Sequence, residues 1–151
     1  MDDLLIARMI HVLSVVIWIG GVYFVTFVIL PGLKHIDDKV SRFEAIENRF
    51  TKHAKIVVTL AGLSGFYMVH QLDGWQWFTD VDFWWVYAMS LLWLIFTFVL
   101  FIAEPLFLHA WFSRQAALNP DRAITIAIRF HQLMALLSFF VIAAAIFGVH
   151  G

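Results

Sequence analysis

Four apolar stretches, each about as long as a bilayer is thick, limit this chain's fold more than any other feature of its sequence. They cover residues 9–30, 56–72, 83–108 and 126–149. A hydrocarbon core about 30 Å thick takes about 20 apolar residues in helical form. Pro31-Gly32 is expected to end the first stretch, and Asp73-Gly74 follows the second. The pattern predicts an all-α fold, an integral membrane four-helix antiparallel bundle. It forms a single domain, residues 1–151, with helices at about 4–30, 40–72, 82–113 and 121–149.

Composition supports a bilayer as the chain's main partner. Hydrophobic residues make up 62% of the sequence and charged residues 14%, which is far more apolar than an ordinary soluble domain. The sequence has no cysteine, so disulfides, thiolate metal sites and iron–sulfur clusters are excluded. No phosphate-binding loop, nucleophile elbow or zinc-protease motif is present, and we expect no nucleic-acid partner.

The charged residues are divided unequally between the two sides of the predicted bundle. Nine of the ten Lys and Arg residues lie in the connections after the first and third apolar stretches: Lys34, Lys39, Arg42, Arg49, Lys52, Lys55, Arg114, Arg122 and Arg129. The other side carries Asp2, Asp3, Asp73, Asp80 and Asp82, with Arg8 as its one cation. Basic loops remain in the cytoplasm. We therefore expect a multi-pass protein of the bacterial inner (cytoplasmic) membrane, with its N- and C-termini periplasmic.

Residues 37–55 are polar, yet they show a helical pattern. Val40, Phe43, Ile46 and Phe50 recur at spacings of three and four, with Glu47 as the exception. We interpret this segment as a cytoplasmic extension of the second helix, which would then be about 50 Å long at 1.5 Å per residue.

Histidines at matching depth are the candidate cofactor ligands. The topology puts His11 and His70 near the outer surface and His53, His109 and His131 near the inner one. The two others, His35 and His150, lie in the cytoplasmic loop and at the C-terminus. Imidazoles from two antiparallel helices can bind the two faces of a haem iron, and bundle cores commonly hold such groups.

Several neighbours of His11 suit a flat macrocycle. Trp18 shares its helix face, and Arg8, one turn away, could pair with a haem propionate. Gly20-Gly21, like the pair Gly62 and Gly65, would let helices approach closely or leave room for a cofactor. The same small residues could support a homodimer.

The stretch from His11 to Gly21, with its His-x6-Trp-x-Gly-Gly spacing, resembles the first helix of the HemJ and CopD families of four-helix bacterial membrane proteins. Residues 47–50 and Gly62-Leu-Ser-Gly65-Phe-Tyr are similar to their second helix. HemJ proteins are protoporphyrinogen oxidases and CopD proteins are copper-resistance proteins. The resemblance implies that His11 is a haem or metal ligand. The later helices lack the lysine-bearing, Tyr-His-Gly and Asn-Glu-x-Pro segments of HemJ, so the chain is similar to the wider superfamily and not to HemJ proper.

Three functions follow from these features. The first is a b-type haem protein, for electron transfer or as a haem-dependent oxidoreductase, with a quinone, a porphyrin-like compound or a respiratory-chain component as its partner. One haem would use His11 with His70, and a second would use two of His53, His109 and His131. The second function is CopD-like copper handling, for which Met9 and Met68 flank the outer histidines. The third is a non-catalytic scaffold subunit.

Overall fold

The computed structural model describes residues 2–150, and the side chains of residues 2–148. Four helical rods, with no strand in that part of the chain, make up the fold. The first rod joins α1 (Asp2–Phe24), the π-helical turn η1 (Val25–Ile29) and α2 (Leu30–Leu33). The second is α3 (Lys39–Gln71). The third joins the short 3-10 helix η3 (Val81–Phe83), α4 (Trp84–Phe98), the π-helical segment η4 (Val99–Leu108) and α5 (His109–Leu118). The fourth is α6 (Pro120–His150).

The predicted all-α fold with four helices is confirmed. Three of the rods are long and apolar enough to cross a membrane: Asp2–Leu33, Val81–Leu118 and Pro120–Gly148. The second rod is not one of them, because its first half is polar. The continuous helix expected over residues 40–72 is present as α3.

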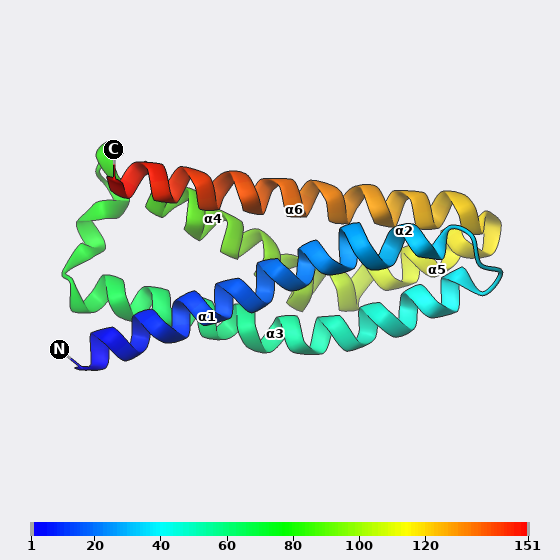
Figure 1. The fold of residues 1–151 in the computed structure, drawn as a ribbon, viewed down its shortest axis with the longest axis horizontal. Helices are drawn as coiled ribbons and strands as arrows, with labels where there is room; N and C mark the ends of the chain where they lie inside the picture. The colour runs from blue at the N-terminus through cyan, green and yellow to red at the C-terminus, as the bar shows by residue number, and fades with distance from the viewer. Residues whose placement is uncertain (1, 151) are drawn as a thin grey trace.

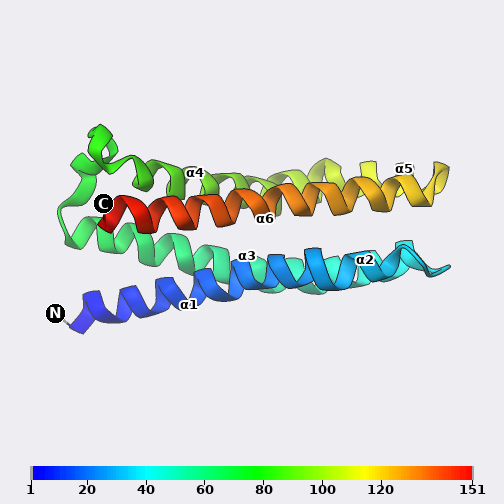
Figure 2. The ribbon, with the colours of Figure 1, turned by 45° about the horizontal axis from the view of Figure 1, so that its top comes forward.

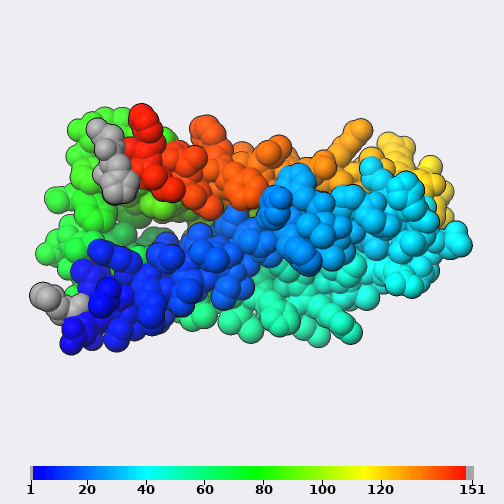
Figure 3. Space-filling view, in the orientation of Figure 1, coloured from blue at the N-terminus to red at the C-terminus, as the bar shows by residue number. Residues whose placement is uncertain are grey.

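Neighbouring rods run antiparallel, so both termini lie at one end of the bundle (Figure 1). We call this the termini end; the opposite end, with the short links after α2 and α5, is the loop end. The rods stay close at the loop end and diverge toward the termini (Figure 2). A hollow between the start of α1 and the end of α6 is visible there in the space-filling view (Figure 3).

The sequence predicted that the first helix ends at Pro31-Gly32, but the first rod does not stop there. The helix passes through both residues and ends at Leu33. Pro31 falls at the first turn of α2, where a missing N–H is tolerated because the wider turn of η1 comes before it. Asp73, in contrast, does end α3: its φ of 48° is left-handed, a conformation that Asp adopts more readily than most residues.

Small residues bring α1 and α3 together along the bundle. Ser14 on α1 and Ala61 on α3 are buried, and Gly21 lies against the ring of Phe50. The core near the middle of the bundle is built around Trp18, Val58 and Phe96, among others. A second cluster at the loop end joins α2, α3, α5 and α6.

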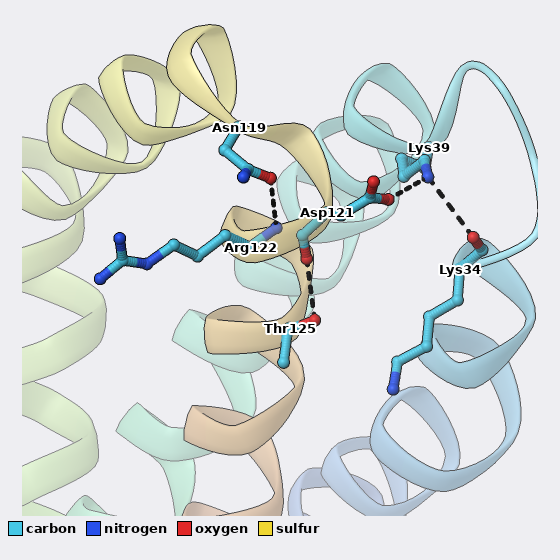
Figure 4. A network of polar contacts seen from close by, with 6 residues as sticks. All are labelled: Lys34, Lys39, Asn119, Asp121, Arg122 and Thr125. Carbon is cyan, nitrogen blue, oxygen red and sulfur yellow. Dashed lines mark hydrogen bonds and ion pairs between the residues drawn. The ribbon is translucent and has the colours of Figure 1, made fainter.

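Polar contacts tie the two connections of the loop end to each other (Figure 4). The ammonium of Lys39, at the start of α3, pairs with the carboxylate of Asp121 in the first turn of α6. The side chain of Asn119 accepts a hydrogen bond from the backbone N–H of Arg122 at 2.9 Å and so caps α6. The register between α3 and α6 is fixed at this end.

Candidate functional site

A cavity of about 760 Å³ lies in the loop half of the bundle. Its walls come from α1, α3, α4, η4, α5 and α6, and they are mostly apolar. Its polar or ionisable lining residues are Trp18, Glu47, Thr51, Glu104, His109, Trp111, Arg114 and His131. A large apolar cavity with a few convergent polar groups is the usual form of a cofactor or ligand site.

The π-helical segment η4 shapes one wall of this cavity. It contains Pro105, which has no N–H to donate and is accommodated in a segment of wider turns. Glu104, just before the proline, faces the cavity, and its carboxylate lies 3.7 Å from the ammonium of Lys55 on α3. Long π-helical segments are rare in proteins, and they often occur at functional sites.

Glu47 contributes a second carboxyl group from α3. It lies in the polar first half of that helix, before the apolar stretch that begins at Ile56. Burial, with the charges of Glu104 and Glu44 as smaller causes, raises the pKa of Glu47 from 4.5 to about 7. A group with such a pKa exchanges a proton near neutral pH.

His131, on α6, is the cavity's best-placed ligand. Its Nδ1 lies 2.8 Å from the carbonyl oxygen of Ala127, so Nδ1–H donates to that oxygen and Nε2 keeps a free lone pair. The rings of Phe43 and Phe130 meet the imidazole edge-on at centroid distances of 6.1 and 5.9 Å. A backbone bond at one nitrogen that leaves the other free is the usual arrangement of metal-ligating histidines. His109, which is more exposed, lines the same cavity.

Trp18 also lines this cavity. Its side chain is 4% exposed, and its ring packs edge-on against Phe96 at 4.8 Å. Within the described part of the chain, its indole N–H has no hydrogen-bond partner. Because an unmet donor in a dry interior is costly, a ligand with an acceptor atom would stabilise this site.

His11 lies outside the cavity and joins α1 to α3. Its Nδ1 is 2.8 Å from the carbonyl oxygen of Ala61 and 3.4 Å from the hydroxyl of Ser64. A Cβ at position 65 would come within 3.2 Å of the imidazole, so Gly65 makes room for it. The hydrogen bond to Ala61 leaves Nε2 of His11 free, but in this structure the imidazole ring serves as a contact between α1 and α3.

The other predicted ligands are exposed and dispersed. His70 is nine residues beyond Ala61 on α3, about two and a half turns, so it points away from the face that meets His11. The ring of His70 faces the indole N–H of Trp75 at 3.5 Å. His53 donates to the carbonyl of Arg49 at 2.8 Å. The structure brings His109 and His131 to one cavity but does not bring His11 and His70 together.

Arg8, the predicted propionate partner, is exposed on α1. Arg114, which was not among the predicted site residues, lines the cavity instead, as does Glu47. The one sequence signal for Glu47 is its break in the apolar spacing of residues 40–50. Arg114 left no such signal, because it is one of nine cations in the basic connections. The side chain of His150 lies outside the described residues.

Among residues 2–148, His, Asp and Glu side chains form no group of three that could hold a metal ion. Haem iron needs one or two axial ligands from the protein. The chain matches no protein-family model, no curated protein and no solved structure.

Proposed function

We propose that this protein is a b-type haem protein of the bacterial inner membrane, and that the cavity of the loop half would hold the haem, with His131 as a ligand of its iron. The observation that carries the proposal is the free Nε2 of His131 in the lining of an apolar cavity of about 760 Å³.

The other lining residues fit the same group. The walls are largely aliphatic and aromatic, as a porphyrin requires. His109 could supply a second ligand, and the guanidinium of Arg114 would suit a propionate. Trp18 offers its unpaired indole N–H as a donor. Bound there, haem would supply one-electron exchange, while the surrounding side chains keep water out and Glu47 holds a proton nearby.

Membrane placement supports an electron-transfer role. We place the three apolar rods across the bilayer, with the basic loop end in the cytoplasm and the termini end in the periplasm. A lipid-soluble quinone is the partner that such a site reaches most directly, because it diffuses within the same layer. In this proposal His11, the histidine of the HemJ- and CopD-like motif, holds α1 against α3.

A reduced-minus-oxidised spectrum of protein purified from haem-replete cells tests the proposal. We expect an α-band at about 560 nm, as for a low-spin b haem with nitrogen ligands. His131→Ala should abolish the band. His53→Ala is the matched control, since His53 makes the same 2.8 Å bond to a carbonyl four residues earlier but lies outside the cavity.

A wild-type protein without the band would refute the haem proposal. If the band is lost in His11→Ala and kept in His131→Ala, the haem is held by the histidine of the sequence motif, and the placement in this cavity is wrong. Copper in a colourless wild-type protein would instead favour the copper-handling function.

A further inference from the structure

One exposed face of α3 changes from apolar to basic halfway along the helix. Toward the termini end it presents Ile56, Leu60 and Leu63, which are 61%, 42% and 66% exposed. The next turn toward the loop end presents three exposed basic residues, Arg49, Lys52 and His53. Spacings of three and four put all six on the same side of the helix. We call this surface the α3 stripe.

The cations of the stripe have no acidic partner in the described part of the chain. Arg42 pairs with Asp38 at 2.8 Å, and Lys39 and Lys55 pair with acidic residues of other helices. No ion pair involves Arg49 or Lys52 among residues 2–148. Arg49 and Lys52 can therefore bind an anion without breaking an existing contact.

These cations lie beside an apolar part of the neighbouring rod. The contact between Gly21 and Phe50 places this level of α3 next to the half of the apolar span Asp2–Leu33 that lies nearer the loop end. There, α1 exposes Ile17 and Phe24, which are 58% and 54% exposed. Between them, a Cβ on Gly20 would meet open space, so the surface is indented at that point. Unpaired cations and lipid-facing side chains thus meet at the same depth.

We propose that the α3 stripe binds an anionic phospholipid, with its phosphate between Arg49 and Lys52 and its acyl chains along Ile56 and Leu60. A ligand that satisfies both halves of the stripe must carry an anionic head and a long apolar tail. Guanidinium and ammonium groups are the usual phosphate partners. A second copy of this chain fits poorly, because a two-fold contact would bring the cations of one stripe against those of the other.

Lipid titration of the purified protein tests this inference, which rests on the membrane placement but not on the haem. In neutral detergent, phosphatidylglycerol should raise the thermal unfolding midpoint and phosphatidylcholine should not. In the double variant Arg49→Gln/Lys52→Gln the apparent affinity should fall roughly 30-fold, at about fivefold per cation near an anionic headgroup. Arg42→Gln, on the same side of the helix but already paired with Asp38, should respond as the wild type does.

Three results would overturn the inference: an equal response to both lipids, an unchanged affinity in the double variant, or the same stabilisation by inorganic phosphate alone. If the double variant does not fold, the phospholipid that copurifies with the wild type and with Lys52→Gln is measured by mass spectrometry. The inference then fails if phosphatidylglycerol is not enriched in the wild type over its share of the membrane, or if Lys52→Gln retains as much. A haem band without lipid selectivity would leave the haem proposal standing. Lipid selectivity without a haem band would leave the lipid inference standing.

Discussion

Replacing Gly62 by alanine should destabilise the bundle through one identifiable collision. A Cβ at this position would overlap the indole ring of Trp93 on α4. That ring has little freedom to move, because its N–H donates to the carbonyl oxygen of Val58 at 2.8 Å and its edge packs against Phe66 at a centroid distance of 5.5 Å. Any shift that relieves the overlap weakens the bond that holds α3 to α4.

The size of the effect follows from three terms. Overpacking a core costs about 1–3 kcal/mol, and loss of the indole hydrogen bond about 1 kcal/mol. Alanine in place of glycine stabilises the folded protein by up to about 1 kcal/mol, because alanine has the higher helix propensity. The net loss for Gly62→Ala is therefore about 1–3 kcal/mol. Gly20→Ala is the matched control: it has open space around its Cβ and should be neutral or stabilising by up to about 1 kcal/mol.

Denaturant-induced unfolding in mild detergent, followed by tryptophan fluorescence, measures both variants against the wild type. Gly62→Ala should be less stable than Gly20→Ala by about 1–4 kcal/mol. Equal stability of the two variants would show that the Trp93 ring can move aside without a loss of stability. The close contact of α3 with α4 would then not depend on a glycine.

Three other perturbations test separate parts of the structure. His11→Ala removes the bond to the Ala61 carbonyl and leaves a void between α1 and α3, so it should lower the free energy of unfolding by about 2–3 kcal/mol in the same assay. Because the pKa of Glu47 is higher in the folded state than its ordinary 4.5, its stabilising effect is complete below that pH and is lost as pH rises toward about 7. Glu47→Gln should therefore flatten the pH dependence of stability between about 4.5 and 7, and an unchanged slope would contradict the assignment. Asp121→Asn breaks an exposed ion pair with Lys39 and should cost less than about 1 kcal/mol, so a larger loss by thermal melting would mean that this contact does more than close the loop end.

The sequence predicts the helices well because apolar length and periodicity are local properties. The long α3 could be predicted from the apolar spacing of residues 40–50, although that segment is too polar to be recognised as a membrane span. Two departures come from backbone geometry that no local pattern shows. The helix continues through Pro31 because a wider turn precedes it, and ten residues around Pro105 are π-helical.

The candidate site was harder to predict, because it depends on the rotation of each helix as well as on depth. Depth alone grouped His11 with His70, but α3 turns His70 away from the face that contacts His11. Depth also grouped His53 with His131, whereas only His131 lines the cavity. Glu47 and Arg114 join the site through the packing of four rods, which a single helix does not reveal.

Haemin titration of apoprotein from haem-deficient cells tests the central claim most directly. For the wild type, His53→Ala and His11→Ala, the Soret absorbance should rise to saturation at one haem per chain in the cavity. His131→Ala should show only the weak, unsaturated response of haemin in detergent. Tight binding of equal stoichiometry to His131→Ala would contradict the account, since it would place the haem outside the cavity that this histidine lines.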